Sequence, residues 1–223
     1  TALLLPLVPI PPRSATHTGP VIPFGRTLAQ MRVMWSSLSL RRNTFIGTIS
    51  FGAFGFIVIG SPLLGEDLAG DAGFGALLLA MIAGGALVGT IWLARAPIVR
   101  VGPGTMAIFT TLLLAVVLLG IAAAPTMTVA FVLALVFGFV QAPQLTGVFQ
   151  VRDRESPQQA RSLVFATAAS LRTGAFAVGS LTAGALVDSG WRPILVAAAL
   201  TQILSVALGL LFAARQHRRP YGR

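Results

Sequence analysis

Six long apolar runs are the feature that most restricts how this chain can fold. Each run is close to the roughly 20 residues that a helix needs to cross a bilayer. Lipid offers no hydrogen bonds to the backbone, so apolar runs of this length are expected to form helices. The connectors are short, which predicts that consecutive helices are antiparallel neighbours. The sequence therefore predicts an all-α integral membrane protein, a six-transmembrane-helix bundle with spans at residues 43–64, 72–94, 104–124, 127–150, 162–187 and 193–214.

Composition supports a lipid environment for most of the surface. Of the 223 residues, 55% are hydrophobic and only 10% are charged, whereas a soluble domain has about 25% charged residues. The chain has no cysteine, which excludes disulfides and thiolate metal sites. It also has no lysine, which excludes a P-loop for ATP. We expect the lipid bilayer to be the main partner.

The net charge of +10 is a topology signal. Almost all the arginines fall before the first run, after the last run or in alternate connectors, which places them on one side of the bundle. The other side has a single arginine, Arg192, and four acidic residues, Glu66, Asp67, Asp71 and Asp188. The positive-inside rule then predicts a multi-pass protein of the cell (inner) membrane with both termini in the cytoplasm. Nucleic acid is not an expected partner.

The two ends of the chain differ from the apolar runs. Residues 1–12 are apolar but too short to span, and we interpret them as the end of a preceding span. The rest of segment 1–42 is predicted to be a cytoplasmic loop, containing either an interfacial helix or a loosely ordered linker. Residues 43–214 form the predicted bundle, and residues 215–223 a basic cytoplasmic tail.

Residues 161–192 resemble part of a known transporter family. They combine a basic residue at the cytoplasmic mouth, glycines along the span and the outer turn Gly190-Trp191-Arg192. The pattern is similar to the penultimate span and final outer loop of the major facilitator superfamily. Arg152-Asp153-Arg154 and Pro157 resemble the cytoplasmic loop that precedes that span.

A second similarity lies between the second and third runs. This connector resembles a degenerate form of the family's cytoplasmic gating loop, which it matches at Arg95, Arg100 and Gly102. The acidic residue usual in that loop is absent here. The resemblance implies that this chain is the second, C-terminal six-helix half of a major facilitator superfamily fold, with its central cytoplasmic loop. It also implies two partners: a small-molecule substrate, and a missing N-terminal six-helix half or a second copy.

Arg172 is the sharpest candidate for a site in the substrate pathway. It lies about ten residues into the fifth run, or roughly 15 Å from the cytoplasmic end. An arginine at this depth is expected to face protein or water rather than lipid. It is either a contact for an anionic substrate or coupling ion, or a guanidinium bonded to helix carbonyls or glutamines.

Gln141 and Gln144 lie one turn apart in the fourth run, with Pro143 between them. Proline removes a backbone donor and tends to kink a helix. The pair either lines the pathway or forms a modest helix–helix hydrogen bond of about 0.6 kcal/mol. Phe54 in the first run is a weaker pathway candidate, since an aromatic residue in a membrane helix usually packs.

Small residues are candidates for close helix packing because they let two backbones approach. The candidates in the second and fifth runs are Gly85, Gly89, Gly174, Gly179 and Gly184.

The family resemblance implies a secondary active transporter of small molecules, and efflux of organic or amphipathic compounds is our leading hypothesis. A sugar or metabolite importer of the same family and a non-transport membrane scaffold remain alternatives. An enzyme is not expected, because both histidines lie outside the apolar runs and no run contains an acidic residue. For the same reason the sequence predicts no metal site and no cofactor.

Overall fold

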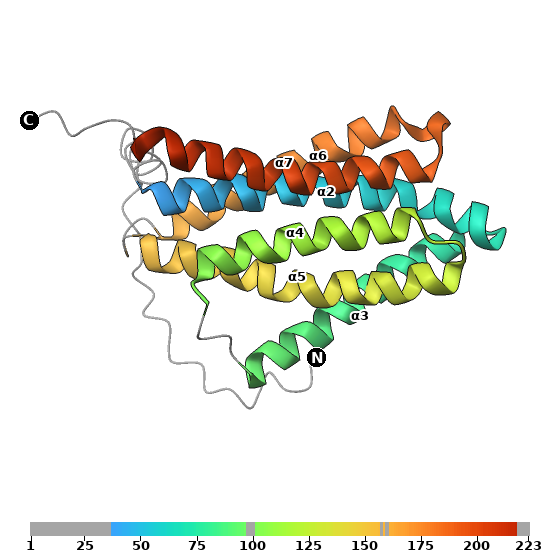
Figure 1. The fold of residues 1–223 in the computed structure, drawn as a ribbon, viewed down its shortest axis with the longest axis horizontal. Helices are drawn as coiled ribbons and strands as arrows, with labels where there is room; N and C mark the ends of the chain where they lie inside the picture. The colour runs from blue at the N-terminus through green and yellow to red at the C-terminus, as the bar shows by residue number, and fades with distance from the viewer. Residues whose placement is uncertain (1–36, 97–100, 157, 159–160, 218–223) are drawn as a thin grey trace, which may run out of the picture.

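The computed structural model describes residues 37–96, 101–156, 158 and 161–217, with side chains up to residue 211 (Figure 1). Within these residues, six helices are long and apolar enough to cross a membrane, which confirms that part of the prediction. They are α2 (Leu38–Ala69), α3 (Gly73–Arg95), α4 (Pro103–Ala122), α5 (Met127–Glu155), α6 (Arg161–Gly184) and α7 (Trp191–His217). A short 3-10 helix, η3 (Val187–Ser189), precedes α7. Residues 1–36, which include the predicted end of a preceding span and most of the predicted loop, lie outside the described residues, as do Arg100 and most of the basic tail. Residues 38–42, expected in that loop, form the start of α2 instead.

Helix ends coincide with capping residues. The Ser37 hydroxyl accepts a hydrogen bond from the Leu40 amide at the start of α2 (3.4 Å), and Thr126 accepts one from Val129 at the start of α5 (3.5 Å). Gly70 ends α2 in the left-handed conformation, with φ of 71°, a conformation that glycine adopts without a steric penalty. These local signals explain where α2 and α5 begin and where α2 ends.

The prediction of a connector at residues 65–71 is wrong, because α2 continues as a helix through Ala69. Neither Pro62 nor Gly65 ends it. Gly65 instead lies against the start of α3, where a Cβ would come 2.7 Å from the Gly75 amide nitrogen. Gly65 therefore allows α2 and α3 to approach each other closely. The turn between them is residues 70–72, which is shorter than the predicted connector.

Helix α2 lies at the centre of the bundle and packs against α3, α5, α6 and α7. Helices α4 and α5 form a second pair, α3 packs mainly on α5, and α4 also contacts α7 (Figure 1). The main core joins these helices through buried side chains such as Ile57, Leu78, Leu118, Phe137 and Ile194. Helices α3 and α6 bury the smallest share of their residues.

The antiparallel order gathers the helix ends and connectors at two opposite ends of the bundle (Figure 1), and most basic residues fall at one of them. One end contains the described basic residues Arg41, Arg42, Arg95, Arg152, Arg154 and Arg161. The other end contains Glu66, Asp67, Asp71, Asp188 and Arg192. We call them the basic end and the acidic end. Which end faces the cytoplasm stays a prediction.

The candidate packing glycines fall into two groups. Gly85 and Gly89 of α3 lie directly against α5, since a Cβ at Gly89 would come 2.6 Å from the Phe139 carbonyl oxygen. Gly179 of α6 lies equally close to the backbone of α2. Gly174 and Gly184 do not pack in this way, because no atom of the described chain lies within 4 Å of a Cβ built there. These two face away from α2, so their expected packing role is not met within this bundle.

Candidate functional site: a polar crevice among five helices

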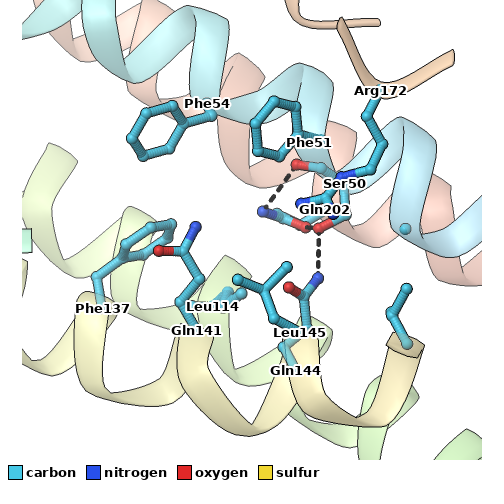
Figure 2. A pocket seen from close by; sticks show the side chains of 12 residues that line it. Ser50, Phe51, Phe54, Leu114, Phe137, Gln141, Gln144, Leu145, Arg172 and Gln202 are labelled. Atoms are coloured by element: carbon cyan, nitrogen blue, oxygen red, sulfur yellow. Dashed lines mark hydrogen bonds between the residues drawn. The ribbon is translucent and has the colours of Figure 1, made fainter. Parts of the chain in front are cut away.

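A narrow crevice runs between α2 and α5 and is closed on its other sides by α4, α6 and α7 (Figure 2). Its volume is about 10 Å³, roughly the space for one water molecule. Its lining combines polar and aromatic groups: Gly47, Ser50, Phe51, Phe54, Leu114, Phe137, Gln141, Gln144, Leu145, Val148, Arg172 and Gln202.

A hydrogen-bond network at the crevice joins four helices. The Gln144 amide donates to the Ser50 hydroxyl (2.7 Å) and to Thr111 Oγ1 of α4 (3.2 Å). The Ser50 hydroxyl donates in turn to Gln202 Oε1 of α7, at 2.5 Å, and Gln202 Nε2 donates to the Ser50 carbonyl at 3.4 Å. All four side chains are buried. Buried polar groups are tolerated when their partners are also buried, and this network supplies those partners.

Gln141 lies one turn before Gln144 on the same helix. Helix α5 continues through Pro143 to Glu155, and the two amides remain on the face toward the crevice (Figure 2). Gln141 is half-buried. It makes no side-chain hydrogen bond to the described part of the chain. It is therefore a polar group available to a bound molecule.

Arg172 reaches the crevice from α6 and lies against aromatic rings. Its Cζ is 4.4 Å from the centroid of the Phe51 ring and 5.8 Å from that of Phe149. Stacking of a guanidinium on an aromatic face is favourable by roughly 0.5–2 kcal/mol. Arg172 Nε is buried without a hydrogen-bond partner among the described residues. The expected alternative, a guanidinium bonded to helix carbonyls or glutamines, is not seen among these residues.

Three phenylalanines form an aromatic wall beside Arg172. The Phe51 ring lies 6.0 Å from that of Phe54 and 6.2 Å from that of Phe176, and the Phe54–Phe176 separation is 6.5 Å. Rings at these separations attract one another beyond simple burial. We call Phe51, Phe54 and Phe176 the aromatic wall. Phe51 and Phe54 give the crevice an apolar side next to its polar network, and Phe176 packs against both.

The structure brings all four predicted pathway residues to one place. Phe54, Gln141, Gln144 and Arg172 come from three helices and line the same crevice. Arg172 stands on the opposite wall from the two glutamines (Figure 2).

Sequence reasoning missed Gln202 and Phe51. Gln202 is the only amide in the last apolar run, a signal that could have singled it out. Nothing in the sequence distinguishes Phe51 from the other phenylalanines of the first run.

The candidate gating residues lie apart from the crevice. Arg95 ends α3 and Gly102 precedes α4, and both are exposed at the basic end. Gly102 lines a separate open groove between α3, α4 and α5 of about 440 Å³. The described residues therefore do not connect this loop to the polar crevice.

No protein-family model, curated protein or solved structure matches this chain. The site is therefore interpreted from its own geometry and from the motifs described above.

Proposed function

We propose that this chain is one six-helix half of a secondary active transporter of the major facilitator type, and that the crevice is part of its substrate pathway. The single observation that most supports this is the meeting of Ser50, Gln144, Arg172 and Gln202, from four helices, at one crevice. Polar and ionisable groups inside a membrane are costly, and they mark pathways in many membrane proteins.

The depth of these residues fits a transport site. Each of the four lies in the middle third of its helix, where a helix that crosses the bilayer is near the midplane. Substrate sites of secondary transporters lie at this level, between bundles that rock against each other. A crevice that is narrow in one state and wider in another is the arrangement such rocking requires.

The aromatic wall favours organic or amphipathic compounds as substrates. The rings of Phe51 and Phe54 line the same crevice as the amide of Gln141 and the guanidinium of Arg172. Such a mixture suits a molecule with both apolar and polar parts. A sugar site would instead need many hydrogen-bonding groups and few apolar ones. On this basis we favour export of organic compounds over import of sugars or metabolites.

The partner we propose is a second bundle packed on the exposed faces of α3 and α6. These helices leave large apolar side chains uncovered, including Leu87 and Val88 on α3 and Val178 and Leu181 on α6. The missing N-terminal half or a second copy of the chain would cover part of them, and lipid the rest. We further propose that the basic end faces the cytoplasm of a cell (inner) membrane.

A membrane scaffold is the second candidate. It is favoured by the fact that the Gln144–Ser50–Gln202 network is satisfied internally, as a purely structural network would be. A scaffold would not need Arg172 inside the bundle, because Arg172 has no polar partner in the described residues and so adds nothing to that network.

Flux measurements on the complete protein in liposomes test the proposal. Transport of an aromatic amphipathic dye along an imposed ion gradient is expected, with Arg172→Gln reducing flux per folded molecule at least tenfold. Exposed Arg154→Gln is the matched control and should transport normally. If Arg172→Gln lowers thermal stability but leaves flux per folded molecule intact, the pathway role is rejected. If the protein moves none of a panel of dyes, sugars and organic acids under any gradient, the scaffold is favoured.

A further inference from the structure

Arg152 is a buried charge that is paired with no acidic side chain of the described residues. Its side chain is 1% exposed, and it is among the largest fully buried side chains of the described chain. Its Nε and Nη2 atoms have no hydrogen-bond partner in the described residues. A buried guanidinium is normally paired, because an unpaired buried charge is strongly unfavourable. Something outside the described contacts is therefore expected to neutralise it.

The chain's acidic side chains do not provide that neutralisation. The sequence has six Asp and Glu residues, and all of them lie in the described part. Four are at the acidic end, on the far side of the bundle. Asp153 pairs with Arg161 at 3.2 Å, and Glu155 accepts a hydrogen bond from Ser37 at 2.7 Å. The neighbouring carboxylates thus have other partners.

Arg172 is a second positive charge facing the same region. It lies over Phe149, which is one turn before Arg152 on α5. The two guanidinium charges are near enough to repel each other. Gly47 lines the crevice together with Arg172, and a Cβ at Gly47 would come 3.5 Å from Arg152 Nη2. Two cations therefore lie at or near the crevice, and neither is paired with an acidic side chain of the described residues.

The contacts of α6 indicate how a ligand could reach both charges. Helix α6 packs on α2 and makes few contacts with α5. The Phe149 and Phe165 rings, 6.0 Å apart, are the described aromatic contact between α5 and α6. Movement of α6 away from α5 would widen the crevice without breaking the main core. This is needed because the crevice as it stands has room for about one water molecule.

We propose that Arg152 and Arg172 together bind the anionic group, a carboxylate or a phosphate, of the transported molecule. Guanidinium groups suit both anions because their planar fork can form two parallel hydrogen bonds. The aromatic wall next to Arg172 would hold the organic part of the same molecule. This inference rests on the proposed function and narrows its substrate to organic anions.

Anion binding can be measured without transport. The anion-binding proposal and the proposed transport function can therefore be tested independently. The purified 223-residue chain is placed in nanodiscs of phosphatidylcholine, and its thermal unfolding is followed with benzoate or phenyl phosphate at constant ionic strength. Benzyl alcohol is the neutral control and benzylamine the cationic one. We expect saturable stabilisation by at least one of the two anions and none by the controls. A parallel sample in phosphatidylglycerol tests whether lipid headgroups occupy the site.

Variants then identify the binding residues. Arg172→Gln and Arg152→Gln are each expected to weaken anion binding at least tenfold, whereas exposed Arg154→Gln is expected to bind normally. Arg152→Lys keeps the charge and is used if Arg152→Gln fails to fold. The proposal is overturned if neither anion stabilises the wild-type protein. It is likewise overturned if Arg172→Gln still binds the anion as the wild type does. It is also overturned if only phosphatidylglycerol stabilises the protein, since the occupant would then be a lipid.

Discussion

The Gln144 side-chain nitrogen of α5 lies 2.7 Å from the Ser50 hydroxyl of α2, across 94 residues of sequence. This contact joins the two walls of the crevice, and it continues through Ser50 to Gln202 of α7. The crevice is therefore organised by hydrogen bonds among helices that are distant in the chain. Its two open polar groups, Gln141 and Arg172, are held on either side of that network (Figure 2).

Replacing Gln144 with Leu should destabilise the bundle. The change removes the hydrogen bonds to Ser50 and Thr111, and membrane hydrogen bonds average about 0.6 kcal/mol each, so a loss of about 1 kcal/mol is expected. Thermal unfolding in detergent measures it. Thr90→Val is the control, since the Thr90 hydroxyl bonds only within its own exposed helix surface. Equal stability of the Gln144→Leu variant and the wild type would mean that the network contributes nothing to folding.

Gly85→Ala should separate α3 from α5. A Cβ at this position would come 2.9 Å from the Leu135 carbonyl carbon and 3.0 Å from the Phe139 amide, so the helices must shift. Overpacking of this kind costs about 1–3 kcal/mol, which a loss of thermal stability would reveal.

Gly174→Ala is the matched control for Gly85→Ala, because a Cβ there has no described atom within 4 Å. The change should be neutral or stabilising by up to about 1 kcal/mol, since alanine favours helix more than glycine does. Loss of assembly of the complete protein in this variant would show that the face of α6 containing Gly174 contacts another bundle.

Single cysteines should report the orientation directly, because the chain has none of its own. Asp188→Cys lies at the acidic end and Gln158→Cys follows α5 at the basic end, and both native residues are exposed. An impermeant maleimide added to intact cells should label position 188 only. Position 158 should be labelled after permeabilisation. The opposite pattern would reverse the proposed topology.

The Arg172→Lys variant tests whether Arg172 acts through its positive charge alone or also through its planar guanidinium group. Lysine keeps the positive charge but lacks the planar fork that stacks on Phe51 and binds an anion with two hydrogen bonds. We expect flux to stay well below wild type, though above that of Arg172→Gln. Full activity with lysine would mean that charge alone is sufficient. Circular dichroism and thermal unfolding check that both variants fold.

The 223-residue chain alone should not transport. If the chain is one half of a transporter, as proposed, it supplies one wall of the pathway, and the rocking motion needs an opposing bundle. Liposomes that contain only this chain are expected to show no gradient-driven flux above empty liposomes. Flux from the chain would contradict this, unless cross-linking showed that two copies form the carrier.

The sequence alone determined the six helices and the separation of charge between the two ends. Both follow from local properties: apolar runs of bilayer length become helices, and short connectors make them antiparallel. The same reasoning placed Arg172 inside the bundle, because lipid exposure of a deep arginine is costly. Where local signals were ambiguous, as at Gly65, the predicted end of α2 was wrong.

Only the tertiary structure decided which faces meet. Helical periodicity says which residues share a face, but the rotation and neighbours of each helix depend on packing between segments far apart in the chain. That packing brought Gln202 to Ser50 and left Gly174 and Gly184 uncovered. It also left Arg152 buried, with its Nε and Nη2 atoms unpartnered among the described residues. Whether a charged side chain is paired depends on the groups that other helices bring next to it, and those neighbours are set only when the helices pack.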